Sequence, residues 1–579
     1  MLTNRSALAL LAAWALSALA SPIEPLVVQD SNHHLATNNI CLDTKSDPPL
    51  ELITPEVYLD DGIVVGFQKG ATDNFLGIPF AEPPTGQRRL RRPEPFPPYE
   101  GIYYAQKFGK SCPQQQLTLP NGLNSQLIHD IGNVVGKLYD GITPDDEDCL
   151  TINVVRPAGT RPGTKLPVVV WIFGGGFEIG GAATYNGGVI VSRSIELGEP
   201  FIFVSMNHRL SAFGFLPGKE VKEAKVGNLG LQDQRLALKW VQTYISEFGG
   251  DPSKVTIWGE SSGAISVALH MLANKGNQEG LFRGAIMQSG GPIPVGDIEN
   301  GQRYYDFMVE RTGCRGSNNT LECLRRIPYN TFKHAMDESP NFFAYQGLVL
   351  AWVPRVDGVF LTEPPQHAVL RGHVSNVPLI TGNCDDEGSL FSISTMNVST
   401  TADLKDYLKL YMMPTAKDEE IDLLLKYYPD DQRAGCPFDT GLKNALSAQY
   451  KRTAALQGDF VFHGPRRFFL KHRADKQNSW AFIWKRAKST PVLGTTHATD
   501  LINSILTPGE LMDYVIHFTS NLNPNSKKGL GIPWPQWNRR DPKAIVLQDS
   551  TLFPVVIGND NYRTDPLDYV ANMSLIYPI

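Results

Sequence analysis

The sequence lacks three features that would each have pointed to a particular class of protein. Beyond residue 20, no run reaches about 18 consecutive apolar residues, so we expect no transmembrane helix in the mature chain. The net charge of −6 carries no basic excess, which argues against a nucleic-acid partner. Internal repeats and low-complexity linkers are also absent. We therefore expect residues 55–579 to form one large domain.

The N-terminus has the pattern of a secretory signal peptide. Arg5 supplies a positive charge, residues 7–16 are apolar, and Ala18-Leu19-Ala20 matches a cleavage site. The alternative is a buried N-terminal helix, because the apolar run is too short to span a bilayer. We expect a signal peptide at residues 1–20, an irregular N-terminal extension at 21–54, and a secreted, extracellular protein.

Secretion permits both disulfides and N-glycosylation. The seven cysteines are an odd number, so at least one stays unpaired within a monomer, and spacing alone does not give the pairing. Asn-x-Ser/Thr sequons at Asn318, Asn397 and Asn572 are candidate glycosylation sites. Each is only a three-residue pattern, so any one of them can be unused.

Two continuous apolar runs, at residues 167–173 and 200–206, have the length of strands that are buried on both faces of a parallel sheet. A helical pattern over residues 229–244 follows them. Alternating strands and helices predict an α/β fold with a large, mostly parallel central sheet flanked by helices. The ligand crevice of such a sheet lies at the carboxyl ends of its strands.

The pentapeptide Gly259-Glu260-Ser261-Ser262-Gly263 lies between a β-branched run and a helix-compatible stretch. Strand, G-x-S-x-G and helix together form the nucleophile elbow of α/β-hydrolases, a turn too tight for side chains at the glycine positions. A pentapeptide alone can match by chance. The strand before it and the helix after it make Ser261 a candidate nucleophile.

A serine hydroxyl is a poor nucleophile unless a general base and an acid that orients the base lie beside it. His497 follows the apolar segment 491–496, and Glu387 follows the strand-like segment 377–382. Both are therefore expected on loops at strand ends. From the residues alone, each choice competes with an ordinary surface histidine or a solvated glutamate.

A glycine run, Gly174-Gly175-Gly176, directly follows the apolar strand at 167–173. Residues without side chains let backbone N–H groups approach a substrate carbonyl, as in an oxyanion hole, with a further donor from the N–H of Ser262. The alternative is a flexible glycine loop.

Together these motifs resemble those of the type-B carboxylesterase/lipase family, which includes the cholinesterases, and are most similar to its secreted fungal lipases and sterol esterases. The similarity runs from about residue 56 to the C-terminus, through residues 75–81, 147–153, 171–180, 228–240, 248–263, 385–388 and 494–500. The resemblance implies an α/β-hydrolase fold with a disulfide-bounded lid loop.

Carried over position by position, the resemblance implies Ser261 as nucleophile, His497 as general base and acid, and Glu387 as the orienting acid. It implies Gly175, Gly176 and Ser262 as backbone donors of the oxyanion hole. No metal and no organic cofactor are required. Ser262 stands where the family usually has alanine, and the donor there is a backbone N–H, so a small side chain suffices.

The resemblance also implies two disulfides, Cys112–Cys149 and Cys314–Cys323, and a buried ion pair between Arg89 and Glu147. Cys41, Cys384 and Cys436 remain unassigned candidates for buried free thiols.

Apolar residues between Cys112 and Cys149 recur at spacings of three and four from Leu123 to Leu138, which indicates one helical face. In the fungal lipases this loop is a mobile lid, so the resemblance implies a lid that opens in transient contact with a lipid–water interface. The alternative is an ordinary surface helix. The loop contains no tryptophan for a cation–π contact, which argues against choline esters.

The resemblance assigns the wall of an acyl-binding tunnel to Phe177, Phe343, Leu348, Leu350, Leu390 and Phe391. Such a wall suits a long acyl chain, at about 0.8 kcal/mol per buried methylene. Plain core packing is the alternative for any one of these residues.

The sequence therefore predicts a secreted serine carboxylic-ester hydrolase that acts through an acyl-enzyme on an ester or lipid substrate. A lipase or sterol esterase is preferred, and a short-chain carboxylesterase is the alternative. A catalytically silent binding or adhesion module is a third hypothesis, because some relatives of this fold family have lost the triad. The oligomeric state does not follow from the sequence.

Overall fold

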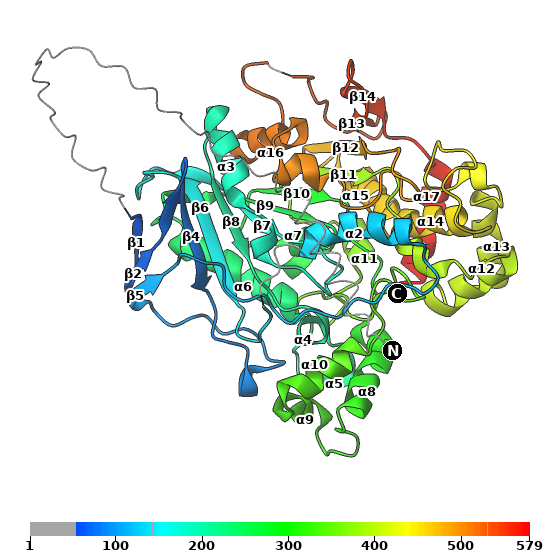
Figure 1. Ribbon diagram of the computed structural model, residues 1–579, viewed down its shortest axis with the longest axis horizontal. Helices are drawn as coiled ribbons and strands as arrows, with labels where there is room; N and C mark the ends of the chain where they lie inside the picture. Colours follow the sequence, from blue (N-terminus) through cyan, green and yellow to red (C-terminus); the bar gives the residue numbers. More distant parts are fainter. Residues whose placement is uncertain (1–53, 140–143, 530) are drawn as a thin grey trace, which may run out of the picture. The chain divides into compact units, whose positions relative to one another are not determined.

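An 11-stranded mixed sheet organises residues 55–579 (Figure 1). The structure is a computed structural model that describes residues 54–139, 144–529 and 531–579. The predicted signal peptide, nearly all of the predicted extension and Cys41 lie outside the described residues.

The strands of the large sheet are, in spatial order, β14 (Val555–Asn559), β13 (Lys543–Gln548), β12 (Ser479–Lys485), β11 (Leu379–Cys384), β10 (Gly284–Gln288), β9 (Gly250–Glu260), β7 (Leu166–Ile172), β8 (Ile202–Met206), β6 (Thr151–Pro157), β4 (Thr72–Pro79) and β3 (Phe67–Lys69). The strands from β13 to β8 are parallel, and the outer strands on both sides pair antiparallel. A separate small sheet contains β1 (Glu56–Leu59), β2 (Asp61–Val65) and β5 (Glu100–Tyr104). The predicted mostly parallel sheet is confirmed.

The helices are α2 (Ser125–Tyr139), α3 (Gly187–Glu196), α4 (Ser211–Phe215), α5 (Lys219–Glu223), α6 (Leu229–Tyr244), α7 (Ser262–Gly276), α8 (Gln302–Arg311), α9 (Thr320–Arg326), α10 (Tyr329–Asp337), α11 (Pro365–Arg371), α12 (Thr401–Tyr407), α13 (Asp418–Tyr427), α14 (Tyr450–Gly458), α15 (Gly464–Arg473), α16 (Glu510–Asn521) and α17 (Thr564–Ile576). The predicted helix at residues 229–244 has the bounds of α6. Within the described parts of the chain, no helix is long and apolar enough to cross a membrane.

The central strands are buried on both faces because helices cover both. Along β7, Val168 and Val170 point into one hydrophobic core, and the alternate residues Val169 and Trp171 point into the other. Helices α6 and α7 pack on one face of the sheet, and α3 and α16 pack on the opposite face. Because both faces of β7 are buried, its sequence is a continuous apolar run.

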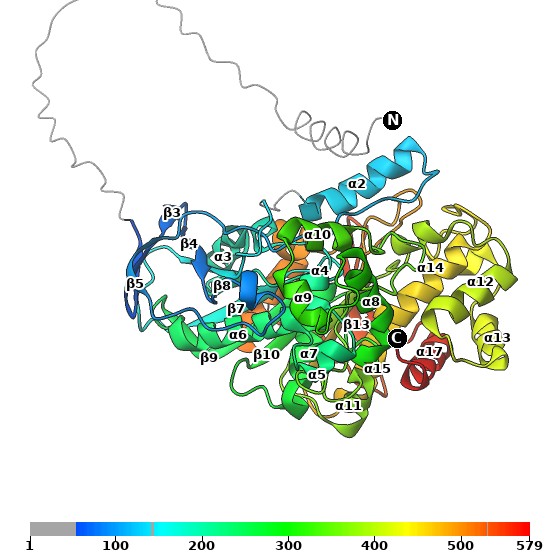
Figure 2. The same cartoon turned by 90° about the horizontal axis from the view of Figure 1, so that it is seen from below.

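Helix α2 lies in the loop that the Cys112–Cys149 disulfide closes, and Figure 2 shows it at the surface of the domain. The predicted helix is present, with Leu127 and Ile131, one turn apart, buried on the same face. Leu123 lies before the first helical residue.

Candidate active site

Ser261 lies in a tight turn between the end of β9 and the start of α7. Its backbone is strained, with φ 56° and ψ −126°. A Cβ at Gly263 would lie 2.0 Å from the carbonyl oxygen of Ile172, and one at Gly259 would lie 2.4 Å from the backbone of Gly263. Only glycine fits at either position, so the serine is presented at the carboxyl edge of the sheet.

The structure brings Ser261, His497 and Glu387 into one hydrogen-bonded chain. His497 Nε2 lies 2.8 Å from Ser261 Oγ, and His497 Nδ1 lies 2.6 Å from Glu387 Oε2. The other carboxylate oxygen, Glu387 Oε1, accepts hydrogen bonds from the Cys384 N–H (2.8 Å) and from Asn383 Nδ2 (3.1 Å). All three residues are buried, so water does not compete for these bonds.

Glu387 follows β11 closely, as the sequence indicated. His497 does not follow a strand of its own: residues 491–496 form an irregular connection well beyond the end of β12, which contradicts the expected position at a strand end. The connection reaches the site because it bridges in parallel to the loop of Glu387, at Asp386 and Thr496.

Glu260, which precedes the nucleophile, is a buried acid that sequence reasoning did not assign to the site. Its Oε1 lies 3.4 Å from His497 Nε2. Burial raises the pKa of Glu260 to about 8. Burial also acts to lower the pKa of His497, but Glu387 and Glu260 outweigh it and raise that pKa above its ordinary value. The only feature of the sequence that could have pointed to Glu260 is its position next to Ser261.

The glycine run packs directly against the nucleophile. A Cβ at Gly174 would lie 2.8 Å from Ser261 Cβ. Gly175 and Gly176 have φ values of +121° and +65°, which residues other than glycine rarely adopt. Both glycines and Ser262, the first residue of α7, line the same cavity as Ser261 and His497.

This cavity measures about 850 Å³, counted with its open mouth, and most of its lining is apolar. Five of the six predicted wall residues line it: Phe177, Leu348, Leu350, Leu390 and Phe391. Phe343 does not, and the prediction is corrected to its neighbour Phe342. The Phe342 N–H donates a hydrogen bond to the buried Glu178 side chain. The rings of Phe342 and Phe343 pack with their centroids 4.6 Å apart, and the Phe342 ring is the one that lines the cavity.

Most of the remaining wall consists of residues that the sequence had not assigned to it: Ile265, Ile293, Pro294, Phe342, Val353, Val461, Phe462, Ala498 and Ile579. Val461 and Phe462 belong to a single π-helical turn, residues 459–463, between α14 and α15. The Phe462 ring lies 4.6 Å from the His497 ring. Nothing in a linear pattern marks this turn, because its residues meet the triad only through the tertiary fold.

Both predicted disulfides, Cys112–Cys149 and Cys314–Cys323, are present, and Cys384 and Cys436 are buried free thiols. Arg89 forms two 2.6 Å hydrogen bonds with the buried Glu147 carboxylate. Asn318, Asn397 and Asn572 are exposed, as a glycosylated asparagine must be.

The chain matches the family described as "Carboxylesterase family" over residues 53–555. It is 41% identical to Lipase 4 of Diutina rugosa over 534 residues, which cover 89% of this chain and 95% of that protein. It is 39% identical to the secreted triacylglycerol lipase LIP1 of Gibberella zeae, covering 89% and 90% of the two chains. Among solved structures, Aspergillus niger EstA superposes with a TM-score of 0.76 at 25% identity, covering 91% of this chain and 99% of that one.

Proposed function

This chain belongs to the carboxylesterase family and is a carboxylic ester hydrolase, and we propose that Ser261, His497 and Glu387 perform its chemistry on long-chain acyl esters. One observation carries the proposal. The Ser261 hydroxyl is hydrogen-bonded to His497 at the wall of an apolar cavity, with the glycine run beside it.

In the acylation step, the Ser261 hydroxyl attacks the ester carbonyl carbon while His497 Nε2 takes the hydroxyl proton. Glu387 holds the imidazole through Nδ1 and stabilises the imidazolium that forms. The backbone N–H groups of Gly175, Gly176 and Ser262 stabilise the negative charge on the tetrahedral oxygen. His497 then gives its proton to the departing alcohol, which leaves the acyl group on Ser261.

In the deacylation step, His497 takes a proton from water, and the water oxygen attacks the acyl carbon. The second tetrahedral intermediate uses the same backbone donors. Its collapse releases the carboxylic acid and returns the proton to Ser261. Both half-reactions therefore use one base and one oxyanion site, and no cofactor enters either of them.

The preference for long acyl chains is supported by the nature of the cavity wall. Phe342, Leu350, Leu390 and Phe391 offer the chain an apolar lining next to the nucleophile. Each buried methylene contributes about 0.8 kcal/mol, so a long chain gains far more than an acetyl group. Two of the similar proteins named above are themselves lipases.

We further propose that the protein is secreted after removal of residues 1–20, and that α2 acts as a lid at a lipid–water interface. Similar proteins named as secreted, the two disulfides and the exposed sequons support an extracellular location. The burial of Leu127 and Ile131 on one face of α2 supports a lid whose apolar face becomes exposed on opening.

Hydrolysis of a p-nitrophenyl ester series from acetate to palmitate, by wild type and Ser261→Ala, tests the proposal. Activity that peaks at long chains and disappears in the variant is the expected result. Serine-dependent activity confined to acetate and butyrate would identify a short-chain carboxylesterase instead. Ester hydrolysis that survives Ser261→Ala would overturn the assignment of the nucleophile.

A further inference from the structure

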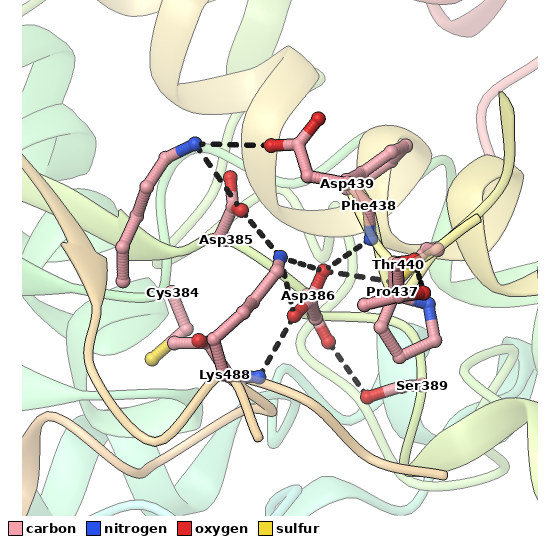
Figure 3. Close-up of polar contacts among 12 residues, drawn as sticks. Cys384, Asp385, Asp386, Ser389, Pro437, Phe438, Asp439, Thr440 and Lys488 are labelled. Carbon is pink, nitrogen blue, oxygen red and sulfur yellow. Dashed lines mark hydrogen bonds and ion pairs between the residues drawn. The ribbon is translucent and has the colours of Figure 1, made fainter. Parts of the chain in front are cut away.

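Asp386, the residue before Glu387, makes hydrogen bonds that connect three chain segments. These are the acid loop (residues 385–389), the base segment (residues 493–497) and the segment 436–440. Figure 3 shows the contacts of Asp386 with Lys488 and with the segment that contains Phe438. Asp386 Oδ2 accepts a hydrogen bond from the Thr495 N–H (2.8 Å), and Oδ1 accepts one from the Phe438 N–H (2.8 Å). The Asp386 side chain is fully buried, so these bonds are made without competition from water.

We propose that Asp386, paired with Lys488, is a positioning residue that sets His497 against Glu387 and Ser261. The proposal rests on the catalytic roles assigned above. Asp386 lies next to Glu387 in the chain, and Thr495 is two residues before His497. A carboxylate that binds both segments therefore controls the distance between the base and the acid that orients it.

The bonding between the acid loop and the base segment is reciprocal. The Asp386 N–H donates to the Thr495 carbonyl oxygen (3.0 Å), while the Asp386 carboxylate accepts from the Thr495 N–H. The Ser389 hydroxyl adds a second connection, because it lies 2.6 Å from the Leu493 carbonyl oxygen and 2.9 Å from the Thr496 hydroxyl. The acid loop is thus joined to the base segment by residues on both sides of Glu387 in the chain, Asp386 and Ser389.

Gly494 provides the space that the carboxylate needs. A Cβ at this position would lie 2.4 Å from Asp386 Oδ2, and its φ of +58° also favours glycine. The base segment is therefore shaped to receive the carboxylate. The catalytic roles of Ser261, His497 and Glu387 do not by themselves require glycine at position 494.

Lys488 supplies the charge that this buried carboxylate requires. Its Nζ lies 2.8 Å from both oxygens of Asp386 and 2.6 Å from Asp385 Oδ2. Burial and the neighbouring Asp385 raise the pKa of Asp386, and Lys488 acts in the opposite direction. Burial alone would also raise the pKa of Asp385, but Lys488 and Lys485 hold it below its ordinary value.

Other charged or titratable groups lie around Asp386 and Lys488: Asp385 and Glu387 on the acid loop, Lys485 at the end of β12, Cys436 and Asp439 on the segment 436–440, Tyr450 and Lys451 on α14, and Arg563 before α17. Lys485 contacts Asp385 (3.3 Å) and Asp439 (3.7 Å). Of the two lysines, Lys488 is the one that contacts Asp386.

The first test compares Asp386→Asn with Asp385→Asn. An asparagine at 386 has the same shape but one carbonyl oxygen for two backbone N–H groups, so one of the two bonds must break. We expect kcat on p-nitrophenyl butyrate to fall roughly 100-fold with KM nearly unchanged, because small misplacements of a catalytic group are that costly. Asp385→Asn removes a contact with the same lysine but no bond to the base segment, so kcat should change much less than in Asp386→Asn.

The second readout is spectroscopic. The far-downfield proton resonance of the short His497–Glu387 hydrogen bond should shift or broaden in Asp386→Asn and remain in place in Asp385→Asn. A merely structural role for Asp386 would lower the unfolding temperature without moving this resonance in the folded protein.

The third comparison keeps the proposal testable if Asp386→Asn fails to fold. Lys488→Met leaves Asp385 and Asp386 without their shared cation, so the pKa of Asp386 rises and its protonation breaks a bond to Thr495 or Phe438. The kcat of Lys488→Met relative to wild type should therefore decrease as the pH is lowered. Lys485→Met removes an equal charge from the same cluster and should follow the wild-type profile.

Equal effects of Asp386→Asn and Asp385→Asn, or identical pH profiles for the two lysine variants, would overturn the positioning role. Ser261→Ala separates this failure from failure of the proposed function. If Ser261→Ala is inactive while the paired variants behave alike, only the role of Asp386 is wrong. If Ser261→Ala is active, the catalytic assignment itself is wrong.

Discussion

Glu260 Oε1 lies 3.4 Å from His497 Nε2, the same nitrogen that contacts the Ser261 hydroxyl. When it is ionised, the Glu260 carboxylate stabilises a protonated imidazole at this distance, but burial raises its pKa to about 8. Its charge therefore supports the imidazolium of the proposed mechanism mainly above that pH.

The pH dependence of kcat/KM follows from the raised pKa of His497. Only a neutral His497 can act as the proposed base, so activity should fall as the pH drops through a value above the ordinary 6.5. Burial raises the pKa of Glu260 to about 8, so this carboxyl group is largely protonated over the acid limb, and Glu260→Gln should leave the limb nearly in place. Measured pH profiles of the two proteins check this, and an acid limb that moves clearly to lower pH in the variant contradicts it.

Removing the nucleophile should abolish turnover without disturbing the cavity. Ser261→Ala should lower kcat roughly 10³-fold or more, because the attacking oxygen is lost while the oxyanion donors remain. Binding of a long-chain fatty acid, followed by fluorescence, should stay close to wild type and serves as the control for folding. Loss of binding together with turnover would indicate a misfolded variant and not a catalytic role.

Narrowing the cavity should change the preferred acyl length. Val353 lines the apolar wall, and Val353→Trp fills space that a long chain would occupy. If the added ring displaces two methylenes, the ratio of kcat/KM for palmitate to that for acetate should fall roughly 10-fold. Acetate is the internal control. An unchanged ratio would show that the chain follows another path.

The two disulfides should differ in their contributions to stability. The Cys112–Cys149 bond closes a separation of 37 residues and Cys314–Cys323 one of 9, so the loop-closure entropies predict losses of about 4 and about 2.6 kcal/mol when each pair is replaced by serine. Urea unfolding of the two double variants measures the difference. The reverse order of destabilisation would show that strain or residual structure outweighs loop length.

A further stability test concerns the buried ion pair between Arg89 and Glu147. Glu147→Gln leaves the guanidinium buried without its counter-charge, which should lower the free energy of unfolding by about 3–5 kcal/mol. Glu82→Gln, which removes a partly exposed partner of Arg88, is the matched control and should cost less than about 1 kcal/mol. Comparable losses in both variants would contradict the importance of burial.

The elements that the sequence predicted well are those in which local pattern and burial coincide. Strand β7 is apolar throughout, and β8 is apolar except at Ser205, because helices cover both faces of the sheet. Helix α6 has a continuous helical pattern with the predicted bounds. The turn at Ser261 could be predicted because two glycines are sterically required there. In each case a short stretch of chain contains the whole physical reason for its structure.

The parts that could not be predicted depend on contacts between distant segments. Phe342 and Phe343 are adjacent aromatic residues in an irregular segment, where no periodicity tells which ring faces the cavity. The π-helical turn that carries Phe462 reaches His497 only through the packing of α14 and α15. The role proposed for Asp386 likewise depends on Thr495 and Phe438, which lie far from it in the chain.

The separation of the triad along the chain has a consequence for biosynthesis. Ser261 and His497 are 236 residues apart, and the parallel strands β11 and β12 lie between them in sequence. A growing polypeptide therefore contains the proposed nucleophile long before the ribosome has made the proposed base. If the two residues act as proposed, the nascent chain holds no complete triad until residue 497 has been added.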